Sequence, residues 1–131
     1  METIIIVTGI LKSNDEYLAV KRSDDDILFP GSWEFPGGHL EMGETLKEGL
    51  KRELKEEIGF DKDFDPKIIG YDDEIRNKNN KVIHHIEIDF IIEVNKKDIN
   101  IKLSNEHTEY VWLKKDSKLL DDYIKSKIMD I

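Results

Sequence analysis

Three glutamates lie within five consecutive positions of this sequence, at a spacing that could hold a metal ion; they are Glu53, Glu56 and Glu57. In an α-helix, which advances about 100° per residue, their carboxylates fall within an arc of roughly 100°. Carboxylates held this close repel one another unless a cation neutralises them, and hard oxygen ligands suit Mg²⁺ or Mn²⁺. The spacing therefore predicts a site for a divalent metal ion.

The surrounding residues predict the helix that must carry these carboxylates. An apolar side chain recurs every four residues, at Leu46, Leu50, Leu54 and Ile58. Thr45 and Glu48 have the spacing of a capping box, and Gly59 would end the helix. We expect the carboxylates at the rim of the buried face, with Gly49 leaving room for a metal or phosphate to approach.

A longer pattern distinguishes a metal site from the alternative of a solvated helix face rich in Glu and Lys. Gly38 is followed after five residues by Glu44, and after seven more by Arg52-Glu53-Leu54-Lys55-Glu56-Glu57-Ile58-Gly59-Phe60. The pattern specifies the residue type at seven of these positions and an apolar residue at two more. At average residue usage, a given starting position would match all nine by chance on the order of once in 10⁹. The segment from Gly38 to Phe60 resembles the Nudix box, and the preceding loop Trp33–Glu41 resembles that of MutT-type members.

The resemblance implies an α/β/α sandwich, an α+β fold in which a mixed β-sheet carries a helix on each face. It implies that Glu53, Glu56, Glu57 and the Gly37 carbonyl bind the metal. Arg52 and Glu44 would brace the loop and orient Glu53 by charge-assisted hydrogen bonds.

Family members commonly recruit one more carboxylate after the long strand, as a ligand or as the base that activates water. Glu106 is the candidate, because Asn105–Trp112 resembles the family's acidic loop and the strand after it. Glu109 and Glu87 are the reserves, and a surface carboxylate is an equally common alternative for Glu106.

Substrate contacts are expected from two further residues. Arg22 follows a strand and could bind a phosphate through two hydrogen bonds, and Phe35 offers an apolar face for a base or ribose. Trp33 is a weaker candidate, since aromatic residues near loops are usually core. His84 is expected to be packed, and the sequence assigns no role to His85 or His107.

Periodicity and turn residues predict the other elements. We expect strands at Thr3–Leu11, Tyr17–Arg22, Lys67–Tyr71, Val82–Val94, Ile99–Leu103 and Tyr110–Leu113. The segment Ser23–Gly38, rich in Pro and Gly, is expected to be a loop. A closing helix should begin at Asp116 or Ser117 and bury Leu120, Ile124 and Ile128.

Composition limits the classes of partner. With 131 residues we expect one domain, 1–131, and 29 Asp and Glu against 20 Lys and Arg argue against binding nucleic acid or anionic membranes. Cysteine is absent, which is compatible with a cytoplasmic location. A homodimer could form through an exposed edge strand or the long strand Val82–Val94.

The resemblance implies a Mg²⁺-dependent enzyme that hydrolyses a phosphoanhydride bond in a nucleoside diphosphate derivative. A nucleoside triphosphate, oxidised or not, is favoured, with a nucleoside monophosphate and pyrophosphate as products. The chain has no proline about sixteen residues beyond the box, where members that cleave ADP-ribose often carry one. ADP-ribose or a related nucleoside diphosphate remains an alternative substrate, and a nucleotide-binding regulatory module without turnover an alternative function.

Overall fold

A mixed sheet forms the framework of the structure, a computed structural model that describes residues 2–25 and 30–131. Its strands in chain order are β1 (Glu2–Ser13), β2 (Glu16–Arg22), β3 (Trp33–Glu34), β4 (Gly37–His39), β5 (Lys67–Lys78), β6 (Lys81–Glu93) and β7 (His107–Leu113). The helices are α1 (Leu46–Ile58), the short 3-10 helix η1 (Lys96–Asp98) and α2 (Asp122–Ser126).

The central strand β1 has different neighbours along its length. It pairs in parallel with β6 from Glu2 to Lys12, and all other strand pairs of the described residues are antiparallel. On its other edge it pairs first with β4, through residues 6–8, and then with β2, through residues 12 and 13. β4 and β2 therefore occupy successive parts of the same edge of β1. β2 in turn pairs with β3 and β7.

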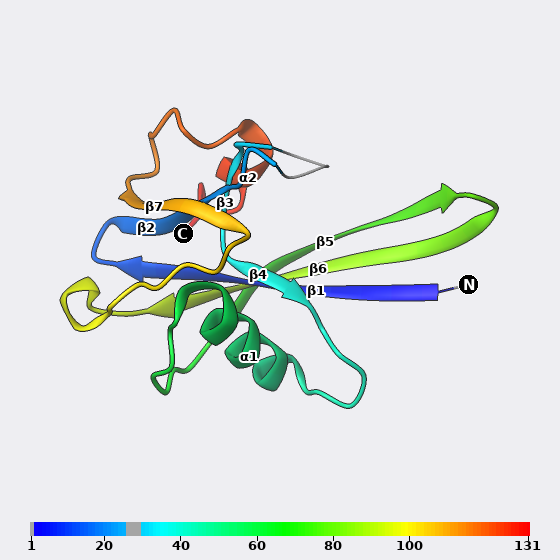
Figure 1. The fold of residues 1–131 in the computed structure, drawn as a ribbon, viewed down its shortest axis with the longest axis horizontal. Coiled ribbons are helices and arrows are strands. Elements are labelled where there is room, and N and C mark those ends of the chain that lie inside the picture. Colours follow the sequence, from blue (N-terminus) through cyan, green and yellow to red (C-terminus); the bar gives the residue numbers. More distant parts are fainter. Residues whose placement is uncertain (1, 26–29) are drawn as a thin grey trace.

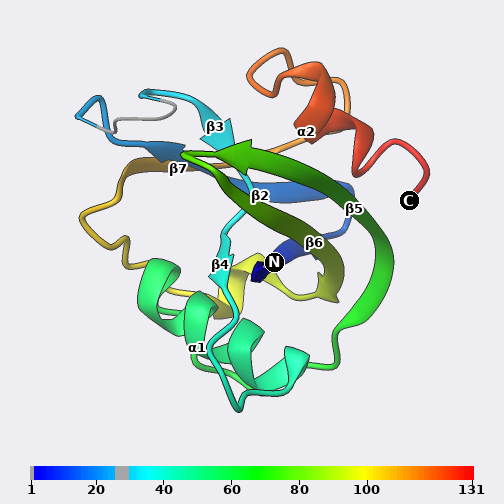
Figure 2. The ribbon, with the colours of Figure 1, turned by 90° about the vertical axis from the view of Figure 1, so that its right-hand side faces the viewer.

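The two α-helices cover opposite faces of this sheet (Figures 1 and 2). On the α1 face, Leu50, Leu54 and Ile58 pack with Leu18 and Phe90. On the α2 face, a second buried cluster comprises Ile10, Tyr17, Ala19, Phe35, Leu113, Leu120 and Ile128. The expected mixed sheet with a helix on each face is confirmed.

Alternation along β6 divides its side chains between the two faces, as expected. Ile88, Phe90 and Ile92 pack on the α1 side, whereas Glu87 and Asp89 meet Lys127, which follows α2. The exposed Val82, at the other end of β6, lies beyond this core.

Four expectations about the elements are wrong. The strand expected at Lys67–Tyr71 continues to Lys78, because its second half pairs with β6. Ile99–Leu103 is not a strand: it crosses the end of α1, where Lys102 N–H donates to the Ile58 carbonyl at 2.9 Å. The closing helix is shorter and begins later, because Asp121 caps it by accepting from Ile124 N–H. The segment Ser23–Gly38 includes β3 and the first two residues of β4, since its backbone pairs with β2 and β1. Asp26–Phe29 lie outside the described residues.

No helix in ranges 2–25 and 30–131 is long and apolar enough to cross a membrane.

Candidate active site

Local capping places α1 where the sequence predicts it. Thr45 accepts from Glu48 N–H at 3.1 Å, and the Glu48 carboxylate accepts from Thr45 N–H at 3.0 Å. Gly59 ends the helix at φ 70°, a left-handed conformation that costs glycine little. These two ends determine which turns of the helix present Glu53 and Glu57.

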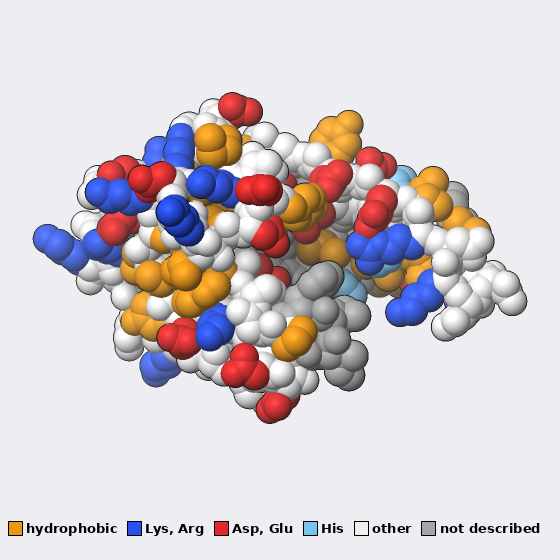
Figure 3. All heavy atoms as spheres, turned by 90° about the horizontal axis from the view of Figure 1, so that it is seen from above, with side chains coloured by type: hydrophobic (Ala, Val, Ile, Leu, Met, Phe, Trp, Pro, Cys, Tyr) orange, Lys and Arg blue, Asp and Glu red, His pale blue; other side chains and the backbone are white. Residues whose placement is uncertain are grey.

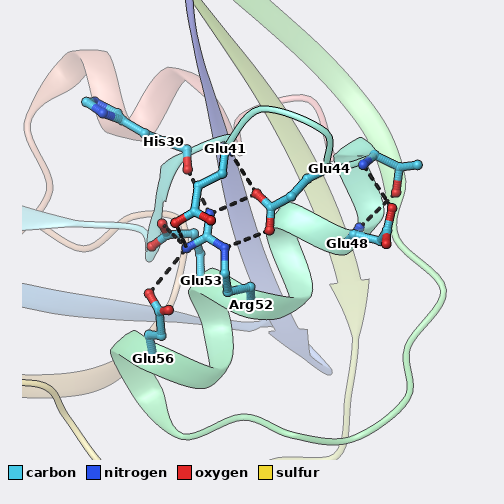
Figure 4. Close-up of polar contacts among 8 residues, drawn as sticks. His39, Glu41, Glu44, Glu48, Arg52, Glu53 and Glu56 are labelled. Atoms are coloured by element: carbon cyan, nitrogen blue, oxygen red, sulfur yellow. Dashed lines mark hydrogen bonds and ion pairs between the residues drawn. The ribbon is translucent and has the colours of Figure 1, made fainter.

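Arg52 joins the loop before α1 to the glutamates of the helix (Figure 4). Its guanidinium donates to Glu44 at 2.7 and 3.0 Å, to Glu53 at 2.9 Å and to the His39 carbonyl at 2.9 Å. The hydrogen bonds from Arg52 lower the pKa of Glu44. Arg52 therefore links the carboxylate of Glu44 in the loop to that of Glu53 on the helix.

Glu57 is the most buried carboxylate of the box. Its side chain accepts the Gly37 N–H at 3.0 Å, and the residue is 8% exposed. Burial raises the pKa of Glu57 to about 8, and repulsion from Glu53, Glu34 and Glu106 adds to this shift. Burial also raises the pKa of Glu53. Both carboxylates would be stabilised in their charged form by a cation between them.

Glu56 lies further out than the other two. Its side chain is 59% exposed and meets Arg52 Nη1 at 3.3 Å (Figure 4). A ligand role for Glu56 would therefore place an ion at the solvent side of the cluster.

The strand β4 comes so close to α1 and β1 that its two glycines have no room for side chains. A Cβ at Gly38 would lie 2.3 Å from the Glu53 carboxylate, and one at Gly37 would lie 2.2 Å from the Val7 carbonyl oxygen. Gly49 differs from expectation. A Cβ there would lie 2.4 Å from the Leu40 side chain, so the space beside Gly49 is filled by Leu40 rather than left for a ligand.

The segment before β7 brings a distant carboxylate to the box. Ligand atoms of Glu106, Glu57 and His107 all lie within 4.8 Å of one another. The Glu106 carbonyl accepts from Ser23 N–H at 2.9 Å, which ties this segment to the end of β2. Glu106 thus lies beside Glu57 of the box although about fifty residues of sequence separate them. Together the three groups offer an ion two carboxylates and a ring nitrogen.

His107 also belongs to a second polar network, which the sequence did not predict. The buried His107 ring meets Glu34 through Nε2 at 3.0 Å, and Glu34 accepts from Arg22 Nη1 at 3.1 and 3.2 Å. His107 Nδ1 is buried without a hydrogen-bond partner in the described part of the chain. The one available signal was that His107 directly follows Glu106.

The remaining expected residues lie in different surroundings. Phe35 is 5% exposed in the core cluster on the α2 face, so its ring offers little surface to a ligand, and Trp33 packs against the same cluster. Glu87 contacts Lys127 on that face, and Glu109 pairs with Lys21 at 3.4 Å. Neither reserve carboxylate belongs to the group formed by Glu57 and Glu106.

Comparisons with known proteins identify the family of the chain. The family described as NUDIX domain matches residues 3–127. The nucleoside triphosphatase NudI of Escherichia coli O17:K52:H18 (strain UMN026 / ExPEC) is 31% identical over 118 residues, which is 83% of this chain and 80% of that protein.

Solved structures share the fold. The crystal structure of the MutT protein from Methanosarcina mazei Go1 matches with a TM-score of 0.72 and 30% identity, over 96% of this chain and 90% of that one. The E. coli dihydroneopterin triphosphate pyrophosphohydrolase matches with a TM-score of 0.77 and 20% identity, over 97% and 93% of the two chains. The chain therefore belongs to the Nudix family and is a MutT-like Nudix pyrophosphohydrolase.

Proposed function

We propose that this enzyme hydrolyses a phosphoanhydride bond in a nucleoside triphosphate in a Mg²⁺-dependent reaction, releasing a nucleoside monophosphate and pyrophosphate. The observation that carries the proposal is the convergence of Glu57 and Glu106 beside the Gly37 backbone. The buried carboxylate of Glu57 is costly in its charged form unless a cation neutralises it, and a polyphosphate needs the same cation.

The donor groups fit a hard divalent ion. Glu53, Glu56, Glu57, Glu106 and the Gly37 carbonyl would hold it, since all five offer oxygen atoms. Burial raises the pKa of Glu57 and Glu53, as expected for carboxylates that await a positive partner. When bound, Mg²⁺, or Mn²⁺ in its place, would neutralise phosphate oxygens and acidify the attacking water.

The protein's own groups would position and deprotonate the water. Glu53 or Glu106 would accept its proton as the oxygen bonds to phosphorus and the bond to the leaving phosphate breaks. Arg52 donates to Glu53 and would hold that carboxylate in place. Arg22, half-buried beside Glu34 at the end of β2, is the candidate contact for a substrate phosphate.

A triphosphate is favoured because two relatives carry it in their names, the NudI nucleoside triphosphatase and the dihydroneopterin triphosphate pyrophosphohydrolase. ADP-ribose and other nucleoside diphosphate derivatives are the alternative. A panel of nucleoside triphosphates, oxidised triphosphates and ADP-ribose, assayed with and without Mg²⁺ and with the products identified, decides between them. Release of pyrophosphate from a triphosphate supports the proposal, and tight binding without turnover would replace it with a regulatory role.

Substitutions test the assignment of the carboxylates. Glu53→Gln and Glu57→Gln should each lower kcat by about 10² to 10⁴, because each removes a charge from the site but leaves its shape. Glu93→Gln is the control, since this exposed carboxylate pairs with Lys12 at 3.8 Å and lies outside the cluster. Near-normal turnover in both site variants would end the assignment.

A further inference from the structure

Within residues 2–25 and 30–131, no strand pairs with the outer edge of β5, so one edge of the sheet is open there. β5 is the last strand in the sheet order, and its other edge pairs with β6. The far half of this β5–β6 hairpin projects beyond the body of the molecule (Figure 1). On β5, Tyr71 and Ile75 are 74% and 65% exposed. A long strand with a free edge and exposed apolar side chains is a template for another strand.

The turn of the hairpin determines which backbone groups point outward. Asn79 and Asn80 have φ values of 53° and 63°, as in a two-residue type I′ turn, and Lys78 lies opposite Lys81. This closing pair is hydrogen-bonded, and hydrogen-bonded pairs alternate along an antiparallel ladder. Arg76 and Glu74 therefore also direct their backbone groups toward β6. The odd-numbered residues of this half of β5 direct theirs toward the open edge.

The charge pattern of β5 is complementary to itself in one antiparallel register. With Ile75 opposite its own copy, Glu74 faces Arg76 of the partner subunit, and Asp72 faces Lys78 of the partner subunit. The two-fold symmetry repeats both pairs, so four opposite-charge pairs form along the edge. Directly opposite side chains lie close enough to interact, with Cβ atoms about 4.5–5.5 Å apart.

Other registers along this half of β5 are worse. In a symmetric antiparallel pair, the two-fold axis passes between one residue and the same residue of the other chain. A register centred on Asp72, Asp73, Glu74 or Arg76 therefore places a charged side chain opposite its own copy. A centre at Asn77 places Arg76 opposite Lys78 of the partner subunit. One at Tyr71 forms no charge pair and runs into the irregularity between Ile68 and Gly70.

We propose that two copies of this chain associate through β5, in antiparallel register centred on Ile75, so that the two sheets continue across a two-fold axis. The pairing satisfies the open backbone edge and brings the two exposed Ile75 side chains together. Figure 3 shows acidic, basic and hydrophobic side chains side by side on the projecting part of the molecule, at the right. The far end of this hairpin lies away from α1 and β4, so the dimer leaves the candidate active site open (Figure 1).

Charge reversal tests the proposal and its register together. Sedimentation velocity should show a wild-type dimer whose dissociation constant rises about tenfold or more in Glu74→Lys and in Arg76→Glu. Each single variant places like charges opposite one another at two positions. Arg76→Lys is the control, because it keeps the charge and should leave association within a few-fold of wild type.

Mixing the two reversed variants gives the decisive result. In a mixed dimer, Lys at position 74 of one chain faces Glu at position 76 of the other, and Arg76 faces Glu74, so association should return to near the wild-type level. Within one chain Glu74 and Arg76 also contact each other, and mixing cannot restore that contact. Recovery therefore reports the pairing between chains.

Several outcomes would overturn the proposal: a monomeric wild type at the highest soluble concentration, single variants that associate as wild type does, or no recovery on mixing. Circular dichroism of each variant verifies that the fold is retained. The result does not depend on the substrate or on the metal, so it stands apart from the proposed hydrolysis.

Discussion

At the scale of single residues, the site is defined by carboxylates whose burial opposes their charge. Glu57 lies almost out of solvent, with the Gly37 N–H as a donor, and Glu53 is held by Arg52. A buried carboxylate is stabilised by a proton or by a cation. Without metal the protein should therefore hold a proton at Glu57, which a divalent ion would displace.

This burial predicts an unusual pH dependence of stability. The pKa of Glu57 is about 8 in the folded protein against about 4.3 in an unfolded chain. Between these values the folded state holds a proton that the unfolded state releases, so the free energy of unfolding falls as pH rises. Without metal, the slope from this group should approach about 1.4 kcal/mol per pH unit. It should be absent in Glu57→Gln.

Urea unfolding at several pH values between about 5 and 8.5, in EDTA, measures the slope. Added Mg²⁺ should stabilise wild type most at high pH, where the carboxylates are free to bind it. The same pH dependence in wild type and Glu57→Gln would show that another group is responsible.

At the scale of elements, the site depends on how closely β4 approaches its neighbours. The two glycines of β4 have different roles: Gly37 admits the backbone of β1, and Gly38 admits the carboxylate of Glu53. The backbone of β1 cannot shift to make room as easily as the carboxylate end of the Glu53 side chain. The same small change should therefore have different effects at adjacent positions.

Gly38→Ala should lower kcat by tenfold or more, because its methyl group displaces Glu53, and a misplacement of about 1 Å can cost about 10²-fold. Its effect on the free energy of unfolding should stay within about 1 kcal/mol. Gly37→Ala should instead destabilise the protein by more than about 2 kcal/mol, since it meets the Val7 carbonyl. Kinetics and denaturant unfolding of both variants check this contrast, which equal losses of stability would contradict.

At the scale of the whole molecule, a buried ionic cluster ties the C-terminal segment to the sheet. Lys127 has a side chain that is 6% exposed; it contacts Glu87, and it meets Asp89 at 3.1 Å. Nearby, Tyr123 of α2 donates to Asp72 of β5 at 2.7 Å. Burial raises the pKa of Asp89, although Lys127 opposes that shift. These contacts supplement the apolar packing of a helix of five residues.

Removing the positive charge of Lys127 should show how much this ionic cluster contributes to the free energy of unfolding. Lys127→Met should lower the free energy of unfolding by about 3–5 kcal/mol near pH 8, because the buried Asp89 and the part-buried Glu87 lose their partner. The loss should shrink near pH 5, where Asp89 takes up a proton. Adding Glu87→Gln and Asp89→Asn to the same variant should recover most of the stability. A loss that persists in this triple variant would point to packing rather than charge.

The sequence by itself determined the box, the helix that carries it and the reaction class. Those features depend on neighbouring residues: the spacing of Glu53 and Glu57, the cap at Thr45 and the stop at Gly59 act within a few turns of one helix. The strict alternation of β6 likewise separated its apolar and acidic faces, because successive side chains of a strand point to opposite sides.

The sequence offered Glu106 as the first of three candidate carboxylates, and only the tertiary structure decided which of the distant groups lie beside the box. Glu106 meets Glu57, and His107 meets Glu34, because β7 pairs with β2 and β2 pairs with β3. Strand pairing of this kind depends on long-range register, which local periodicity does not encode. The same reason explains Ile99–Leu103, whose apolar residues pack against the α1 cluster while its backbone binds the end of the helix instead of a strand.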